Sequence, residues 1–158
     1  MTYTDNGLEL IATGTDVKTG PYYSTGYLDL GVSPDVGTGA DIVAHIIIET
    51  FTDSGSGTGC HFEIVASSAT NLQTAPLVLG SSGDILSADL ELCDDAGRAG
   101  AYQPLIVRIN PNHWDALGVA ASGVSSAIGR YIGLRIVHDG ANPTALNVHA
   151  QFVTNWSS

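Results

Sequence analysis

The sequence predicts a single all-β domain, a jelly-roll β-sandwich of about eight strands that carries an extended N-terminal arm. Three observations predict it. Apolar and polar residues alternate with a period of two in several separate runs, the connections between these runs are rich in Gly, Ser and Asp, and helical patterns are scarce. Without alternation of strands and helices, such runs favour packed antiparallel sheets. At 158 residues, with no internal repeat or linker, the chain has the size of one domain.

The clearest alternation lies in residues 41–51 and 60–66. Ile46 and its apolar neighbours two positions away fall on one face of the first run, and His45 falls on the other. Residues 52–59, between the two runs, are glycines and small polar residues that are typical of a turn or loop. We therefore expect the two runs to form a hairpin with a long tip.

Three further runs alternate in the same way, at residues 103–109, 130–137 and 146–152. Residues 139–143 join the last two, and their Asp, Gly, Asn and Pro predict a turn and hence a second hairpin. Residues 114–121 carry only a weak pattern for one or two helical turns. Shorter strands are expected at residues 27–30, 76–79 and 89–92.

The start of the chain differs from the rest. Residues 13–21 are turn-forming and contain little that would pack into a core. We therefore expect residues 1–20 to form an extended arm that becomes ordered on a partner, and residues 21–158 to form the sandwich domain.

Composition argues against two classes of partner. Sixteen acidic and five basic residues give a formal net charge of -11, which repels a phosphate backbone, so nucleic acid is not expected as a partner. The longest apolar stretches, such as residues 46–48 and 105–107, are far shorter than the ~20 residues that span a bilayer, so no membrane partner is expected either. The N-terminus lacks the basic and apolar regions of a secretory signal, which predicts synthesis in a cytoplasm.

No catalytic motif stands out, and the sequence predicts that the protein is not an enzyme. No Gly-x-Ser-x-Gly elbow occurs. Cys60 and His61 are adjacent, but neighbours in a strand point to opposite faces and cannot form a nucleophile–base pair. We expect Cys60 and Cys93 to be unpaired, partly buried thiols, with a disulfide between them as the alternative. Paired carboxylates for glycoside hydrolysis stay open, because the fold sets their spacing.

Metal-ligand patterns are weak, and no metal or other cofactor is expected. His61 and Glu63 share one strand face, and Asp94 and Asp95 lie in a loop flanked by glycine. There is no calcium-loop pattern and no pair of histidines two positions apart. The sequence favours an ordinary exposed strand face for His61 and Glu63.

Several aromatic residues lie outside the alternating runs. Tyr22, Tyr23, Trp114 and Trp156 fall in loops or near an end, which suits a recognition surface for sugar rings or for a protein. The alternative is that each fills an end of the sandwich. Residues 110–129 are too many for an ordinary strand connection, and loops of this length usually carry a function.

An ordered series of landmarks runs from about residue 23 to residue 153. The landmarks are residues 27–31 (Tyr-Leu-Asp-Leu-Gly), 34–39 (Pro-Asp-Val-Gly-Thr-Gly), 42–56, 75–82, 85–90, 129–135 and 146–152. In order and spacing they resemble the capsid cement, or decoration, proteins of tailed bacteriophages, notably the Bordetella phage type. Residues 110–129 look like an insertion relative to that family.

The resemblance implies a virion protein that sits on the outside of an icosahedral capsid, is made in the host cytoplasm, and bridges neighbouring major capsid proteins. It implies a small jelly roll that also binds itself, with a homodimer preferred and a trimer as the alternative, and it brings no catalytic residues. We expect the arm and the long loop to make the contacts. The candidate partner-binding residues are Tyr3, Leu8, Leu10, Tyr22, Tyr23, His113, Trp114 and Leu117.

Two other functions remain as alternatives. The first is a carbohydrate-binding or receptor-binding sandwich that stacks sugars on Tyr22, Tyr23, Trp114 or Trp156. The second, with the weakest support, is a hydrolase on the same scaffold.

Overall fold

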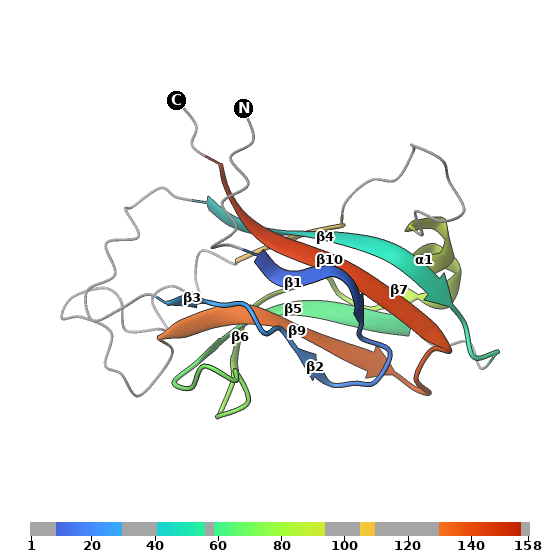
Figure 1. Ribbon diagram of the computed structural model, residues 1–158, viewed down its shortest axis with the longest axis horizontal. Coiled ribbons are helices and arrows are strands. Elements are labelled where there is room, and N and C mark those ends of the chain that lie inside the picture. Colours follow the sequence, from blue (N-terminus) through green and yellow to red (C-terminus); the bar gives the residue numbers. More distant parts are fainter. Residues whose placement is uncertain (1–8, 30–40, 56–58, 94–104, 110–129, 156–158) are drawn as a thin grey trace.

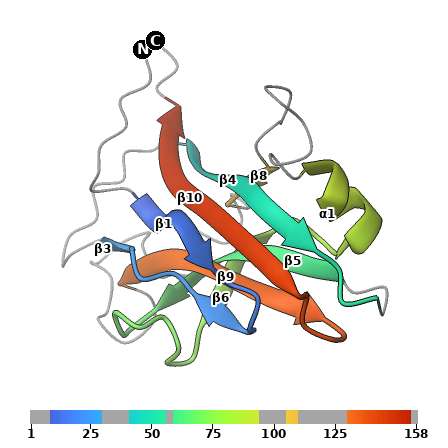
Figure 2. The same cartoon turned by 45° about the vertical axis from the view of Figure 1, so that its right-hand side comes forward.

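The computed structural model describes residues 9–29, 41–55, 59–93, 105–109 and 130–155. These residues form two antiparallel sheets packed face to face (Figure 1, Figure 2). The predicted all-β sandwich is therefore confirmed. Within these ranges, no helix has both the length and the apolar character that crossing a bilayer requires.

One sheet, here called the β10 sheet, has four strands in the order β1-β10-β4-β8. Their bounds are β1 Glu9–Asp16, β4 Asp41–Thr52, β8 Leu105–Arg108 and β10 Ala145–Asn155. The other, here called the β9 sheet, has the order β2-β9-β5-β6, with β3 paired to β9 and β7 paired to β5. Their bounds are β2 Tyr22–Tyr23, β3 Leu28–Asp29, β5 Gly59–Ser67, β6 Leu77–Ser81, β7 Ile85–Leu86 and β9 Tyr131–Asp139. A short helix, α1, spans Ser87–Cys93.

The two sheets enclose one core, and the predicted inward faces are confirmed. The buried side chains recur at every second position of the long strands. They include Ala44, Ile46 and Ile48 of β4, Cys60, Phe62 and Ile64 of β5, Ile132, Leu134 and Ile136 of β9, and Leu146, Val148 and Ala150 of β10. Each large apolar side chain buried in this way contributes roughly 1.5–3 kcal/mol of transfer free energy.

Both predicted hairpins are wrong. β4 pairs with β10 and β8 in one sheet, whereas β5 pairs with β9, β6 and β7 in the other, so these two strands lie in different sheets. The connection between β9 and β10 crosses between the sheets. Glycine-rich and Asn-Pro turns reverse the chain in either geometry, and the local sequence does not distinguish a hairpin from a crossing between sheets.

The short strand predicted at residues 89–92 is helical instead, as part of α1. Ser87 begins the helix and Asp89 lies in its first turn, where an acidic side chain favours the positive end of the helix dipole. Leu90 is fully buried against the core. Periodicity alone does not distinguish a strand from a helix in an apolar run this short. The strands predicted at residues 27–30 and 76–79 are confirmed as β3 and β6.

The extended arm predicted for residues 1–20 is wrong over the residues that the structure describes. β1 pairs with β10, and Leu10, Ile11 and Val17 are at most 1% exposed. Its register shifts twice, and Gly14 has a positive φ of 77°, so the strand is irregular and its sequence does not alternate. Residues 1–8, the rest of the predicted arm, lie outside the described ranges, as does the weak helix predicted at residues 114–121.

Glycines bring the two sheets together along both sides of the sandwich. On one side Gly26 donates its backbone N–H to the carbonyl of Leu10 at 3.0 Å, and a Cβ atom on Gly26 would lie 1.9 Å from the carbonyl oxygen of Glu9. On the other side a Cβ atom on Gly80 would lie 2.0 Å from the carbonyl oxygen of Arg108. Both sides are therefore closed by backbone contact.

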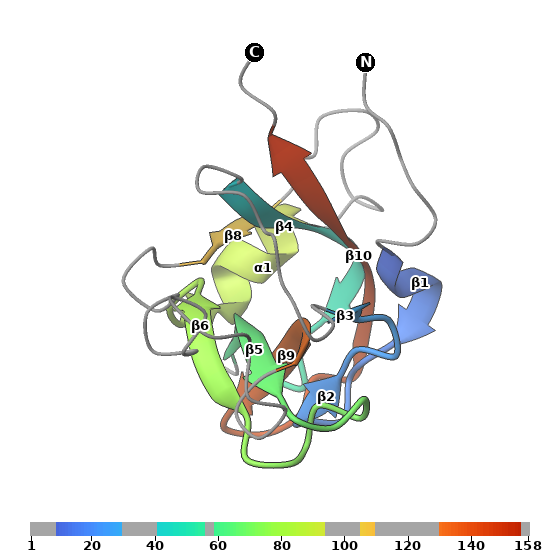
Figure 3. The ribbon, with the colours of Figure 1, turned by 90° about the vertical axis from the view of Figure 1, so that its left-hand side faces the viewer.

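One end of the sandwich anchors four segments that lie outside the described ranges. Strand pairing places the described residues that flank these segments together, and Figure 1 and Figure 3 show them at the same end of both sheets. The pairs are Glu9 with Gln151, Asp41 with Asn155, Val43 with Arg108, and Asp29 with Tyr131. The segments anchored there are residues 1–8, 30–40, 110–129 and 156–158.

Candidate functional site

The structure describes only part of the predicted contact set. Tyr22 and Tyr23 form β2 and are half-buried. Leu10 is 1% exposed in the core, so its prediction as a partner contact is wrong, because the strand that carries it is part of the sandwich. The remaining candidates lie outside the described ranges. They are Tyr3, Leu8, His113, Trp114 and Leu117, together with Trp156 of the alternative function.

Tyr22 and Tyr23 line one depression, of about 530 Å³, together with Tyr27. We call it the tyrosine groove. Its other lining residues are polar or small, namely Pro21, Ser24, Thr25, Thr70, Asn71 and Gln73. Sequence analysis missed Tyr27, Asn71 and Gln73 as members of the site. The groove combines aromatic rings with amide and hydroxyl groups, which is the mixture that recognises sugars or polar peptide segments.

A folded-back loop, residues 68–76, builds one wall of the groove. Leu72 is fully buried with a φ of 60°, and it lies against Gly133, where a Cβ atom would be 2.2 Å from the Leu72 side chain. Ser67 fastens the loop, since its hydroxyl donates to the carbonyl of Thr74 at 2.7 Å. A large side chain at position 133 would displace Leu72, so this glycine is required by close approach.

Hydrogen bonds fix the opposite wall. Ser24 exchanges backbone and side-chain bonds with Leu134, at 2.8 Å from the Ser24 N–H to the Leu134 carbonyl and 3.0 Å from the Leu134 N–H to the Ser24 hydroxyl. Tyr27 packs edge-to-face on Tyr131, with ring centroids 5.2 Å apart. The guanidinium of Arg130 lies 5.2 Å from the centroid of the same Tyr131 ring. The groove is thus preorganised by its surroundings.

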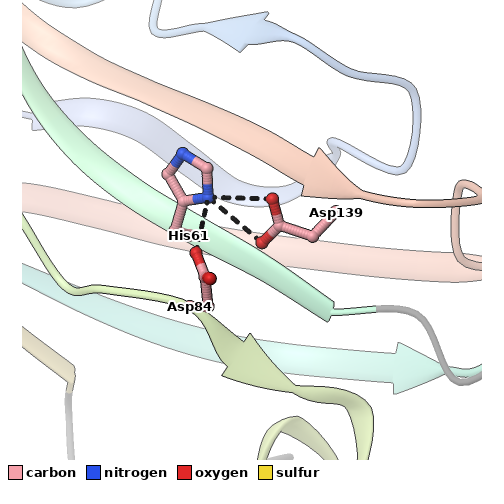
Figure 4. Close-up of side chains that lie close together, drawn as sticks. All are labelled: His61, Asp84 and Asp139. Atoms are coloured by element: carbon pink, nitrogen blue, oxygen red, sulfur yellow. Dashed lines mark hydrogen bonds and ion pairs between the residues drawn. The ribbon is translucent and has the colours of Figure 1, made fainter.

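A second site lies on the outer face of the β9 sheet, where His61 is surrounded by carboxylates (Figure 4). The Nδ1 atom of His61 is 3.1 Å from each carboxylate oxygen of Asp139 and 3.5 Å from an oxygen of Asp84. Its Nε2 atom is 3.4 Å from Glu63. We call His61, Asp84 and Asp139 the histidine–aspartate cluster.

Glu63 and Arg135 support His61 from the neighbouring positions of β5 and β9. Glu63 is only 8% exposed, and Arg135 donates to it from Nε at 2.5 Å. Burial opposes the charged form of Arg135, but hydrogen bonds to Glu63 and Tyr23 outweigh burial and raise the pKa of Arg135 above its usual value. The prediction of an ordinary exposed strand face is therefore wrong for Glu63.

The period-two pattern of β5 predicts two members of this site but not the others. His61 and Glu63 share a face because they lie two positions apart. Asp139 is brought in by the register of β5 and β9, and Asp84 comes from the loop before β7. An Asp at the end of β9 and an Asp in a distant loop carry no local signal of this proximity.

Cys60 lies on the opposite face of β5 from His61, as predicted. It is a free thiol, 1% exposed, and burial, reinforced by the charge of Asp139, raises the pKa of Cys60 to about 12. The thiol is therefore protonated at neutral pH and is a poor nucleophile. The side chain of Cys93 lies outside the described residues.

Comparison with models of known protein families and with curated proteins gives no match for this chain.

Proposed function

We propose that the protein is a cement protein that decorates the outer surface of an icosahedral tailed-phage capsid and bridges neighbouring major capsid proteins. The observation that supports this most is that the described residues flanking residues 1–8, 30–40, 110–129 and 156–158 all lie at one end of a sandwich that has its own core. Such a body can present several segments to a shell while keeping its own fold.

The topology supports the jelly-roll assignment. Most consecutive strands lie in different sheets, as β3, β4 and β5 do and as β7, β8, β9 and β10 do. Since backbone contacts close both sides, an added strand has little access there, and we place the capsid contacts at the end that anchors the four segments.

The charge of the chain supports the same role. A formal net charge of -11 keeps unbound copies soluble and complements a basic patch on a capsid surface. Bridging adds interface area between capsid proteins without altering their folds. The proposal retains self-association, with a homodimer preferred over a trimer.

Replacing residues 110–129 by a short Gly-Ser linker should weaken binding to capsid particles at least about tenfold, which corresponds to ~1.4 kcal/mol. Binding should weaken because residues 110–129 are expected to contact the capsid. The fold should persist because the flanking strands β8 and β9 keep their own pairing. Co-sedimentation of the purified chain with particles that lack it measures the change.

The matched control is Asn142→Ala, an exposed position in the connection between β9 and β10 at the opposite end of the sandwich. This variant should bind particles like the unaltered chain. If purified particles carry none of this protein on their outer surface, the cement proposal is wrong.

The tyrosine groove favours a second candidate function, recognition of a carbohydrate. Tyr27 is 37% exposed and offers a ring edge and face, and exposed Asn71 and Gln73 offer amide donors and acceptors close by. Stacking on an aromatic ring together with amide hydrogen bonds suits a sugar ring. A receptor-binding role would use the same chemistry.

Tyr27→Ala should reduce glycan affinity at least about tenfold, because it removes ring area worth roughly 1.4 kcal/mol or more. Glycan-array screening identifies a ligand, and titration calorimetry then compares the variants. Ile106→Ala, an exposed apolar position on the β10 sheet, is the control and should bind normally. Absence of any glycan bound by the unaltered chain would count against this candidate.

A further inference from the structure

We propose that the histidine–aspartate cluster binds one divalent transition-metal ion, of which Zn²⁺ is the best fit, through Nδ1 of His61 and one carboxylate oxygen each from Asp84 and Asp139. These three ligand atoms all lie within 4.8 Å of one another. They come from β5, from the loop before β7 and from the end of β9, and Figure 4 shows both carboxylates directed at the same ring nitrogen.

The spacing of the donor atoms suits a tetrahedral ion. Zn²⁺ binds nitrogen and oxygen at ~2.0–2.1 Å, so two donors at a tetrahedral angle lie about 3.3 Å apart. The Nδ1 atom of His61 lies 3.1 Å from Asp139 and 3.5 Å from Asp84, on either side of that value. The oxygens of Asp84 and Asp139 lie within 4.8 Å of each other, so rotation of these side chains would bring all three donors to that spacing.

A carboxylate also lies on the far side of the imidazole. Glu63, 8% exposed and held by Arg135, lies 3.4 Å from Nε2 of His61. A metal bound to Nδ1 would leave the ring proton on Nε2, where Glu63 can accept it. This is the carboxylate–histidine–metal arrangement of many metal sites.

Charge gives a second reason for a cation. Asp84 and Asp139 direct two carboxylates at the same ring nitrogen, and their negative charges repel each other. Arg135 is paired with Glu63 on the other side of the ring. A cation between the three donors removes the repulsion, and imidazole as a donor favours a transition metal over Ca²⁺ or Mg²⁺.

The site has room for further ligands. Asp84 is 80% exposed and Asp139 is 37% exposed at their side chains. Three protein ligands with an open fourth position leave space for water or for a donor from a partner protein.

Zn²⁺ should raise the melting temperature of the full-length protein, because the ion binds donors that are brought together only in the folded chain. At one hundred times the dissociation constant the expected rise is roughly 5–10 °C. The chain is first treated with a chelator, then melted with and without Zn²⁺, and calorimetry should give about one ion per chain.

Asp84→Asn and Asp139→Asn should each abolish most of the shift, and Asp84→Asn should fold normally because the Asp84 side chain is exposed. The control is Glu9→Gln, which alters an isolated carboxylate–histidine pair, 3.6 Å from His149, and should retain the full shift. The proposal is overturned if Zn²⁺ leaves the melting temperature of the unaltered chain unchanged, if Asp84→Asn retains the shift, or if Ca²⁺ produces an equal shift.

Discussion

Deleting residues 1–20 should unfold the sandwich. The deletion removes β1, whose side chains Leu10 and Ile11 are buried between the sheets, and the adjacent buried Val17. It also exposes one edge of β10 and breaks the bond from the Val17 N–H to the Leu146 carbonyl, 2.8 Å long. Truncating one buried Leu or Ile costs ~2–5 kcal/mol, and a typical domain is stable by only about 5–15 kcal/mol.

The matched control is deletion of residues 1–8, which leaves all of β1 in place. This shorter deletion should leave a cooperative melting transition, measured by circular dichroism, while the longer one should show none. Under the cement proposal, the shorter deletion should still weaken binding to particles. A cooperative transition near the original temperature after removal of residues 1–20 would contradict the assignment of β1 to the core.

The faces of the strands were predictable because the pattern that sets them is local. Phe62 and Ile64 of β5 are buried, as their alternation with His61 and Glu63 predicts. A residue two positions away along a strand points the same way whatever the strand pairs with. The same reasoning succeeds for β9 and for β10.

The pairing of the strands was not predictable from such patterns. β10 pairs with β4 over eleven residues, from Ala145 opposite Thr52 to Asn155 opposite Asp41, although most of the chain separates the two strands. Both predicted hairpins assumed that neighbours in sequence pair with each other. The free energy that decides between the two arrangements comes from packing across the whole core, and no short segment contains it.

The members of the two candidate sites are also only partly predictable from local sequence patterns. Tyr22 and Tyr23 are predicted as recognition residues because they fall outside the alternating runs. Asn71 and Gln73 join them only because Leu72 takes a left-handed backbone conformation and folds its loop onto the sheet. A Leu at positive φ is uncommon, so its sequence gives no signal for this turn.

Gly26→Ala should destabilise the protein by roughly 2–4 kcal/mol, the sum of overpacking and of one lost hydrogen bond. The added Cβ atom would lie 1.9 Å from the carbonyl oxygen of Glu9 and 2.8 Å from Cα of Leu10, so the backbone of β1 must move. That movement lengthens the 3.0 Å bond from Gly26 to Leu10 and loosens the contact that joins the two sheets.

Gly14→Ala is the matched control, because it makes the same chemical change within β1 where the Cβ atom meets nothing within 4 Å. Its cost is the backbone strain of an L-residue at a φ of 77°, about 1–2 kcal/mol. Urea unfolding of the two variants separates the cost of the close contact at position 26 from the cost of backbone strain at position 14. A larger loss of unfolding free energy for Gly26→Ala shows that the close approach of Gly26 to β1 holds the two sheets together. Equal losses in the two variants would mean that β1 adjusts freely and that this side of the sandwich is open to a partner strand.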